Sequence, residues 1–340
     1  MTTKNVRLRD VAEAAGTSTK TASRVINGDP RVSAATRRRV EEAVATLGYQ
    51  VDLMARSLRR GVDDTIGIIV PTIGDPFFAG MLDEIERIAM TRDFKVLVAN
   101  NSRSPEVERK VVEGLLARRV AGLIVTPNNA DYAFLSTVRT PVVFLDRHPA
   151  GLEAGCVRVD DRGEARRVVH HLAAAGHRRI AFVADDLQIR TSELRYAGYR
   201  EAMAELGLPL DPDLVAIGFI YAEQAERATA EMLGRANPPT AIFSSRSETS
   251  LGVARALHQG GRTDIAFVSF GDFIMADCLS PAVTVLDHDP RALARRAVER
   301  LLARLDGAAD RGDDDVEPLT LIARGSGEIP APDVVREVAS

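Results

Sequence analysis

The sequence has few cysteines and no long apolar run. Cys156 and Cys278 are the only cysteines, and they lie far apart and outside any CxxC motif. This spacing argues against a disulfide framework and against a structural zinc site. The first ten residues form no apolar signal segment, and no stretch of about 18 apolar residues occurs anywhere in the chain. We therefore expect a cytoplasmic protein without a membrane-spanning helix.

The sequence also lacks the common signatures of enzymes. It contains no GxGxxG after an apolar strand, no Walker loop and no GxSxG. His170, His171 and His177 have no Cys or His partner at metal-ligand spacing. The run Asp313–Asp315 is interpreted as solvated, with a metal site as the weaker alternative. We expect no enzyme activity, no cofactor and no metal.

Charge is divided unevenly along the chain. The 340 residues are 45% hydrophobic and 27% charged, with a formal net charge of −4, a composition typical of globular proteins. This length is sufficient for two or three domains. Residues 1–60 contain 12 Lys and Arg against 6 Asp and Glu, whereas the rest contain 32 against 42. A small basic segment before an acidic body indicates that the segment binds a polyanion.

The first fifty residues have the spacing of three short helices. Apolar residues recur at helical intervals up to Gly16, which is expected to end the first helix. Ser18 is placed to cap a second helix that ends at the turn 27–30. Ser33 is placed to cap a third helix that ends at Gly48. This arrangement predicts a compact helical domain in residues 1–50.

From residue 65 onward, short apolar runs alternate with longer amphipathic segments. This alternation predicts an α/β fold with parallel sheets covered on both faces. The rhythm restarts near residue 160, which predicts two similar lobes, one from about 62–160 and 290–318 and the other from about 162–288 and 320–330. Residues 307–317 are expected to form an exposed loop. The predicted strands are 65–71, 95–100, 122–127, 141–146, 156–160, 179–185, 241–245 and 265–270, and the segments 282–288 and 320–329 remain to be shared between the lobes.

Two helices joined by a glycine-containing turn form a helix-turn-helix pattern, in which the second helix enters the DNA major groove. That helix spans residues 18–27 here. Its hydroxyl groups suit phosphate contacts, and its long cations can reach guanine bases. The alternative is a small three-helix bundle that docks a protein. The hydroxyl and cationic residues are Ser18, Thr19, Lys20, Thr21, Ser23 and Arg24.

The segment RLRDVAEAAGTSTKTASRVINGDPRVSAATRRRVEEAVATLGY (7–49) resembles the head of the lactose-repressor (LacI/GalR) family of bacterial regulators. Thr17 and Ala22 stand where this family usually has Val. The resemblance continues through ARSLRRG and TIGIIVP to GSGEI near residue 328. It implies a DNA-binding repressor with a helix-turn-helix head and a two-lobed body similar to periplasmic sugar-binding proteins. A homodimer on palindromic double-stranded DNA is the expected assembly, and residues 331–340 contain no leucine heptad for a tetramer.

The resemblance also implies roles for individual head residues. Thr19 and Lys20 match the positions that vary with operator sequence, and Arg24 matches an arginine that contacts bases. Other matched residues contact or frame phosphates. The head residues expected at the DNA are Arg9, Ser18, Thr19, Lys20, Thr21, Ser23, Arg24 and Asn27.

Residues 51–61 are a basic stretch that can be a linker or a short helix. The resemblance implies the hinge helix of the family, with Ala55 and Leu58 entering the minor groove and Leu58 acting as a wedge. The alternative for Leu58 is an ordinary core position. Val51 and Asp52 replace the family's usual Pro-Asn, and Asp52 either weakens DNA binding or caps the hinge helix.

The two lobes predict a ligand cleft at the carboxyl ends of their strands. The resemblance places the segment 75–78 beside the ligand and Arg195 in contact with ligand hydroxyls or carboxylates. The alternative for Phe77 and Phe78 is simple packing of a helix on the sheet, and we expect one of them to pack and one to line the cleft. The candidate effector-binding residues are Asp75, Phe77, Phe78, Asp146, Arg147, Arg190, Thr191, Arg195, Arg246 and Asp272.

Two departures from the family pattern concern the charge of the cleft. Arg246 and Ser247 stand where the family commonly has Asn-Asp, and Gly271 replaces an acidic residue. These changes favour an anionic effector such as a sugar acid or a sugar phosphate, and a neutral sugar is the other candidate. The alternative is that the cleft arginines pair with Asp146, Asp160 or Asp272. A periplasmic ligand-binding protein is the second functional class, and the basic head argues against it.

Overall fold

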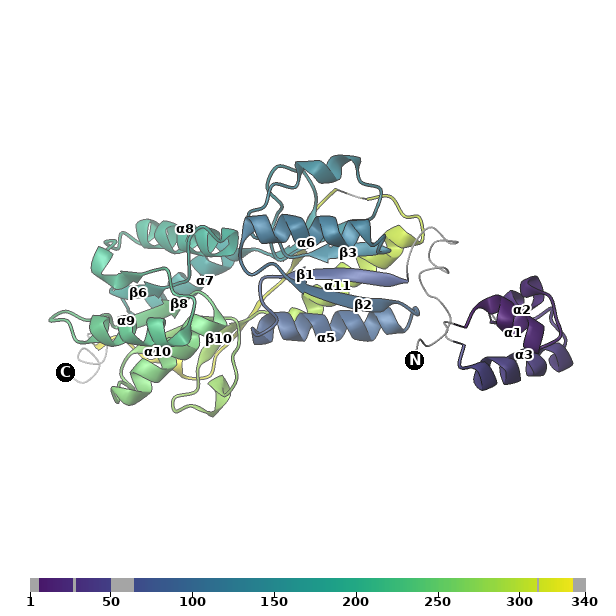
Figure 1. The fold of residues 1–340 in the computed structure, drawn as a ribbon. Coiled ribbons are helices and arrows are strands. Elements are labelled where there is room, and N and C mark those ends of the chain that lie inside the picture. The colour runs from purple at the N-terminus through teal and green to yellow at the C-terminus, as the bar shows by residue number, and fades with distance from the viewer. Residues whose placement is uncertain (1–5, 27–28, 50–63, 311, 333–340) are drawn as a thin grey trace. The chain divides into compact units, whose positions relative to one another are not determined.

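The computed structural model describes residues 6–26, 29–49, 64–310 and 312–332. The chain forms two compact units, Met1–Asp63 and Asp64–Ser340, which we call the head and the body. Figure 1 shows the helices of the head and the two sheets of the body. Within the described residues, no helix is long and apolar enough to cross a membrane.

The head consists of three helices, α1 (Leu8–Ala14), α2 (Thr19–Ile26) and α3 (Ala34–Leu47). The Ser18 hydroxyl accepts a hydrogen bond from the Thr21 backbone N–H, and Ser33 caps α3 in the same way through Thr36. Gly48 follows α3 in the left-handed conformation with φ of 63°, which glycine adopts without steric cost. These boundaries confirm the helices and caps predicted from the sequence. Their shared core contains Val11, Ala12, Ala15, Ala22, Val25, Val40 and Ala43.

The first sheet of the body has the strand order β11-β5-β4-β3-β1-β2, and all its strands are parallel. Side chains alternate between its two faces, so Ile68 packs with α5 and α11 whereas Ile69 packs with α6. Figure 1 shows α5 and α6 on opposite sides of this sheet. The elements are β1 (Thr65–Val70), α5 (Pro76–Met90), β2 (Lys95–Asn100), α6 (Pro105–Ala117), β3 (Gly122–Val125), η1 (Ala133–Thr137), β4 (Val142–Leu145), β5 (Cys156–Val159), α11 (Pro290–Leu305) and β11 (Asp315–Glu317).

The second sheet has the order β12-β10-β9-β8-β6-β7, with β12 antiparallel to β10 and the other neighbours parallel. Helices α7 and α8 pack with Phe182 and Phe243 on one face, and α9 and α10 pack with Ile242 and Phe267 on the other. The elements are α7 (Asp161–Ala174), β6 (Ile180–Val183), α8 (Arg190–Glu205), η2 (Pro212–Leu214), β7 (Val215–Ala216), α9 (Ala222–Leu233), β8 (Ala241–Ser244), α10 (Ser247–Gln259), β9 (Ala266–Phe270), η3 (Ala276–Cys278), β10 (Thr284–Asp287), β12 (Thr320–Ile322) and η4 (Ser326–Glu328).

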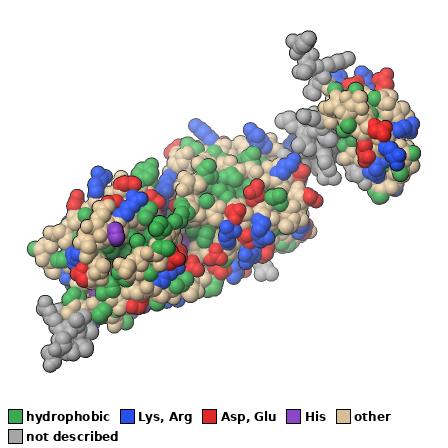
Figure 2. Space-filling model, turned by 90° about the horizontal axis from the view of Figure 1, so that it is seen from below, with side chains coloured by type: hydrophobic (Ala, Val, Ile, Leu, Met, Phe, Trp, Pro, Cys, Tyr) green, Lys and Arg blue, Asp and Glu red, His purple; other side chains and the backbone are tan. Residues whose placement is uncertain are grey.

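We call each sheet with its helices a lobe. The chain passes between the lobes three times: after β5, after β10 and between β11 and β12. Acidic and basic side chains intermingle over the face of the body shown in Figure 2. The predicted α/β class with two parallel-sheet lobes is confirmed.

The prediction of an exposed loop at 307–317 is wrong at its end. Residues 315–317 form β11, which pairs with β5. Asp314 accepts hydrogen bonds from Arg158 at 2.8 Å and from the Cys156 backbone N–H at 3.1 Å. Asp315 accepts one from Arg296 at 2.6 Å. The Asp313–Asp315 run is therefore partly paired rather than simply solvated.

Candidate functional site

The exposed face of α2 carries the residues predicted to read DNA. Thr19, Lys20 and Arg24 are exposed, and Ala22 and Val25 hold the opposite face of the helix in the core. Among the described residues, the one ion pair of Arg24 joins its Nε atom to Asp29 at 3.8 Å, which is too long for a hydrogen bond. The long cations of this face are therefore available for a partner.

Other predicted DNA residues lie around the start of α2 or outside the described residues. The exposed Ser18 and the half-buried Thr21 exchange a hydroxyl hydrogen bond of 2.9 Å beside the helix N-terminus. Ser23 is half-buried, and Arg9 is exposed on α1. The remaining three predicted residues, Asn27, Ala55 and Leu58, lie outside the described residues.

A pocket lies between the two lobes of the body. It encloses about 590 Å³ of space free of protein atoms, part of it open to solvent. Its polar residues follow the carboxyl ends of strands from both sheets, as expected for parallel α/β folds. The lining residues are Pro71, Asp75, Phe77, Phe78, Arg103, Asn128, Asp146, Arg147, Asp185, Ile189, Thr191, Ser192, Arg195, Arg246, Ser247, Phe270 and His288.

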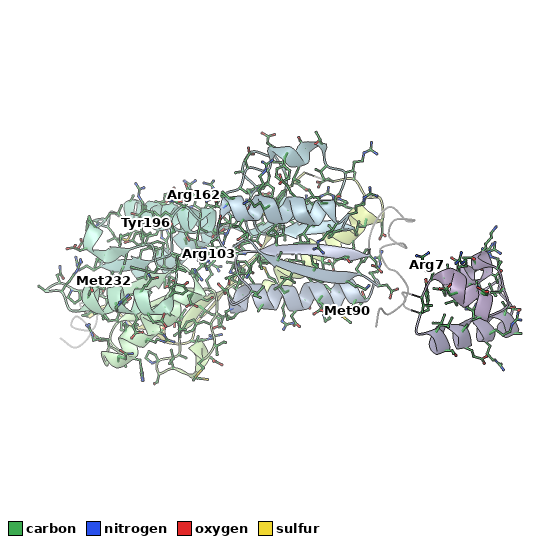
Figure 3. The ribbon with its side chains drawn as sticks, viewed as in Figure 1. Arg7, Met90, Arg103, Arg162, Tyr196 and Met232 are labelled. Atoms are coloured by element: carbon green, nitrogen blue, oxygen red, sulfur yellow. The ribbon has the colours of Figure 1, made fainter. Side chains whose placement is uncertain are left out.

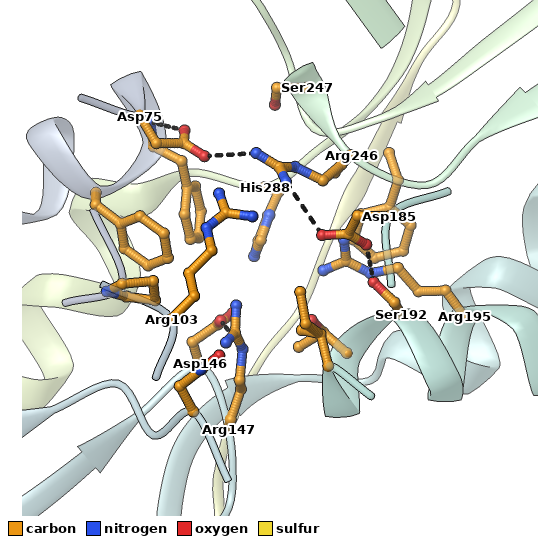
Figure 4. A pocket seen from close by; sticks show the side chains of 17 residues that line it. Asp75, Arg103, Asp146, Arg147, Asp185, Ser192, Arg195, Arg246, Ser247 and His288 are labelled. Atoms are coloured by element: carbon orange, nitrogen blue, oxygen red, sulfur yellow. Dashed lines mark hydrogen bonds and ion pairs between the residues drawn. The ribbon is translucent and has the colours of Figure 1, made fainter. Parts of the chain in front are cut away.

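Arg246 joins the two lobes across this pocket. It precedes α10 in the second lobe, and its guanidinium lies 3.1 Å from Asp75 of the first lobe and 3.1 Å from Asp185 of its own lobe. Figure 4 shows both contacts. Asp75 also caps α5 by accepting a hydrogen bond from the Phe77 backbone N–H at 3.0 Å. Among the described residues, Arg246–Asp75 is the one ion pair between the lobes.

Arg195 is the most buried cation of the pocket. Its guanidinium donates to Asp161 at 2.7 Å and to the Ser245 carbonyl at 2.5 Å, and it lies 3.7 Å from the centre of the Phe270 ring. Burial raises the pKa of Asp161 to about 6, and the charge of Arg195 counters this effect. The guanidinium is thus held in a fixed position with a carboxylate behind it.

Arg147 is paired within the first lobe. Its Nε atom lies 3.1 Å from Asp146, which is 5% exposed and has a φ of 70°. A non-glycine residue in this left-handed region is held there by its surroundings, and the Asp146 N–H donates to the Val157 carbonyl at 2.8 Å. All four predicted arginines thus pair with carboxylates, but only Arg147 does so with one of the expected partners, Asp146. The other pairs are Arg190–Glu193, Arg195–Asp161, and Arg246 with Asp75 and Asp185.

His288 lies in the connection from β10 to α11, between the lobes. Its ring stacks on Phe77 with 4.4 Å between centroids and meets the edge of Phe270 at 5.7 Å. Burial, together with the charge of Arg195, holds the pKa of His288 well below its usual value. The ring is therefore neutral, and its Nε2 atom has no hydrogen-bond partner among the described residues.

The structure does not bring two of the predicted residues into the pocket. Arg190 is exposed and donates to Glu193 at 2.7 Å. Asp272 is exposed and accepts two hydrogen bonds from Arg324. Both follow a strand closely in sequence, but pairing with a surface neighbour turns each side chain away. The other eight predicted residues line the pocket together, and Phe77 and Phe78 both do so.

Gly271 has a backbone reason for being glycine. Its φ is 90°, and a Cβ atom there would lie 2.9 Å from the Ser247 hydroxyl oxygen. An aspartate at this position would be strained whatever its charge. Local backbone geometry therefore favours glycine at this position.

Sequence reasoning missed several lining residues. Asp185 and His288 are the last residues of the apolar segments 179–185 and 282–288, so the same rule that selected Asp146 could have found them. Arg103 follows β2 in a turn where Ser102 and Arg103 both have positive φ, 54° and 56°. No sequence pattern indicates that turn. Figure 3 labels Arg103 between the elements of the two lobes.

The pocket chemistry suits binding rather than catalysis. Paired carboxylates and guanidiniums, aromatic rings and neutral polar groups can hold a small hydroxylated ligand. In the described part of the chain, no group of three or more His, Cys, Asp or Glu residues is placed to hold a metal ion.

Comparison with known proteins identifies both parts of the chain. A family model described as bacterial regulatory proteins of the lacI family matches residues 7–52, and a periplasmic binding protein-like domain matches residues 169–327. The HTH-type transcriptional regulator GalR of Escherichia coli (strain K12) is 31% identical over 330 residues, covering 95% of this chain and 96% of GalR. The HTH-type transcriptional repressor CytR of the same strain is 28% identical over 325 residues, covering 94% and 95%.

Solved structures agree in fold. A lac repressor structure bound to ONPG in the repressed state matches with a TM-score of 0.84 and 30% identity, covering 95% of this chain and all of that chain. A CelR–cellobiose complex matches with a TM-score of 0.69 and 28% identity, covering 94% and 99%. The chain is therefore a DNA-binding transcriptional regulator rather than an enzyme, and it belongs to the lacI family of bacterial regulatory proteins.

Proposed function

We propose that this protein is a repressor that binds a palindromic double-stranded operator as a homodimer, and that a small sugar, sugar acid or sugar phosphate controls its operator affinity. The observation that carries the proposal is the pocket between the lobes, because side chains of both lobes line it. A ligand in this position contacts both lobes at once, so its binding energy depends on their arrangement. The proposed compartment is the cytoplasm, where such a protein meets DNA.

Related proteins support this assignment. One solved lac repressor structure is described as a dimer bound to operator and to the anti-inducer ONPF, and the CelR structure contains cellobiose. In our chain, the proposed effector contacts come from the eight predicted residues that line the pocket: Asp75, Phe77, Phe78, Asp146, Arg147, Thr191, Arg195 and Arg246.

The proposed division of the chain follows the predicted boundaries. Residues 1–50 bind the major groove, 51–61 form the hinge, 62–330 bind the effector and dimerise, and 331–340 form a tail. In the hinge, Leu58→Ala removes the proposed minor-groove wedge, so operator affinity and DNA bending decrease while the fold persists. Gel shift and DNA-bending assays measure both effects, and unchanged bending contradicts the hinge role.

Selection from a randomised DNA library tests operator recognition. The full chain is expected to select a palindrome with half-sites about one helical turn apart. Lys20→Ala should then change base preference at one or two positions, because its exposed ammonium reads bases. Ser18→Ala should weaken binding to all sequences similarly, because a phosphate contact carries no base information. Unchanged preference for the Lys20 variant contradicts its reading role, and failure to select any sequence rejects the proposed function.

A further inference from the structure

Arg103 is the pocket arginine that no carboxylate holds. Arg195 and Arg246 donate hydrogen bonds to Asp oxygens, and Arg147 Nε lies 3.1 Å from Asp146 as an ion pair without a hydrogen bond. Among the described residues, the Arg103 guanidinium has no ion pair and no hydrogen bond, although it lines the pocket and its side chain is partly buried. A guanidinium carries five N–H donors, so these donors are available for a ligand.

Other guanidiniums surround this cation. Burial lowers the pKa of Arg103, and the positive charges of Arg246 and Arg147 lower it further. Asp75 and Asp185 attract Arg103, but both of them accept hydrogen bonds from Arg246 and neither reaches Arg103. Figure 4 shows the Arg103 guanidinium directed into the pocket between Asp75 and Asp146.

The position of Arg103 is built by a buried network behind the pocket. The Arg103 backbone N–H donates to the Asn101 side-chain oxygen at 3.0 Å, and the Asn101 amide donates to Glu108 at 2.6 Å. Glu108 is fully buried and also accepts from the Asn128 backbone N–H at 2.7 Å and from the Tyr132 hydroxyl at 2.7 Å. One buried carboxylate therefore fixes both Arg103 and Asn128 at the pocket wall.

Neutral polar groups complete the lining near this cation. The Nε2 atom of His288 is buried without a hydrogen-bond partner among the described residues. The Asn128 side-chain amide lines the pocket and makes no hydrogen bond to another described residue. A buried polar atom without a partner is costly, and this applies to His288 Nε2. The Asn128 amide also lines the pocket, and both groups can bind ligand hydroxyls.

We propose that the effector carries one anionic group, a carboxylate or a phosphate, which binds the Arg103 guanidinium, and that Arg103 makes this regulator select anionic over neutral sugars. The inference rests on the proposed function of the pocket as the effector site. The sequence suggested Arg246, and Arg195 for ligand carboxylates, but carboxylates of the protein already pair with both. A guanidinium binds carboxylate or phosphate through two parallel hydrogen bonds, which a neutral hydroxyl group cannot reproduce.

Binding of inorganic phosphate to the full chain tests the proposal without any knowledge of the sugar. Melting temperatures are measured in phosphate and in chloride at matched ionic strength, and a phosphate-specific increase reports binding to the folded state. Arg103→Gln should weaken phosphate binding roughly tenfold or more. The control Arg190→Gln removes an exposed arginine beside the same cleft that does not line the pocket, and should bind phosphate like the wild type. Equal effects of phosphate and chloride on the wild type, or equal phosphate binding by the Arg103 variant, would overturn the proposal.

Operator release separates this inference from the proposed function. Neutral sugars, the matching sugar acids and the matching sugar phosphates are added to the complex of the full chain with its selected DNA. The active compounds are expected to be anionic and to lose potency in the Arg103 variant. A neutral sugar that releases DNA equally from the wild type and from the Arg103 variant refutes the anionic effector and leaves the proposed function intact.

Discussion

Asp75→Asn separates the ion pair between the lobes from the cap of α5. Asp75 Oδ1 accepts the capping hydrogen bond, and Oδ2 accepts from Arg246. Asparagine keeps an oxygen acceptor for the cap. Its NH₂ group replaces the oxygen that accepted from Arg246, and this group is itself a donor, so it cannot accept from the guanidinium. The variant therefore removes one charge-assisted hydrogen bond between the lobes and leaves α5 capped.

The expected loss of stability follows from burial. The side chains of Asp75 and Arg246 are each 13% exposed, so water screens their interaction little. A hydrogen bond to a charged group contributes about 1.5–3 kcal/mol. Arg246 retains Asp185 as a partner, which places the expected cost near the lower limit, at about 1.5–2 kcal/mol.

Asp83→Asn is the matched control on the same helix. Asp83 pairs with Arg291 at 2.7 Å, but the two side chains are 61% and 51% exposed. Exposed pairs of this kind contribute little, so this variant should cost at most about 0.5 kcal/mol. Asp75→Ala, which also removes the cap, should cost about 1 kcal/mol more than Asp75→Asn.

Urea unfolding of the full chain measures these differences. Four of the five tyrosines lie in the body and the chain has no tryptophan, so near-ultraviolet circular dichroism reports mainly on the body. The free energy of unfolding follows from the midpoint and slope of the transition. Equal losses for Asp75→Asn and Asp83→Asn, or an unchanged midpoint for Asp75→Asn, would refute the argument that the interlobe pair stabilises the body.

Three further predictions concern stability and are measured by thermal or urea unfolding. Glu108→Gln leaves at least one buried donor without an acceptor and should cost about 1–3 kcal/mol; an unchanged midpoint contradicts the network. Gly252→Ala places a Cβ atom 2.2 Å from a backbone oxygen of α9 and should cost about 1–3 kcal/mol of stability. In α6, a Cβ atom at Gly114 meets nothing within 4 Å, so Gly114→Ala should stabilise by roughly 0.5–1 kcal/mol. Equal effects of the two variants contradict the close packing of α10 on α9. Hydrogen bonding from Arg87 lowers the pKa of Glu84 from 4.5 to about 2. Ionised Glu84 therefore stabilises the fold above pH 4.5, and this contribution is lost as the pH falls toward 2, so Glu84→Gln should flatten the melting temperature across that range.

The sequence predicted the fold where burial dictates the residue pattern. Parallel strands covered on both faces must be continuously apolar, and runs such as 65–70 and 180–183 are visible for this reason. Strands β7 and β11 were missed because they contain two and three residues at sheet edges. In β11, Arg296 pairs with both Asp315 and Glu317, so electrostatic contacts replace the apolar signal.

The site was predictable as far as topology determines it. Carboxyl ends of parallel strands meet at one edge, which correctly brings together Asp75, Asp146 and Arg246. The direction of a side chain beyond that edge depends on its neighbours, and Arg190 therefore pairs with Glu193 on the surface. Arg103 enters the pocket through two consecutive left-handed residues, in a turn held by Asn101, whose amide binds the buried Glu108.

Arg246 connects the stability of the interlobe pair to the proposed anion site. Its guanidinium is shared between Asp75 of the first lobe and Asp185 of the second, and its charge acts on Arg103. In the proposal the ligand anion binds Arg103, where both the positive charge of Arg246 and the negative charge of Asp75 act. Coupling between binding and lobe arrangement is reciprocal. Removal of the Asp75 carboxylate eliminates a stabilising contact between the lobes and a negative charge near the proposed anion site, so Asp75→Asn should lower stability and raise phosphate affinity in the melting-temperature assay.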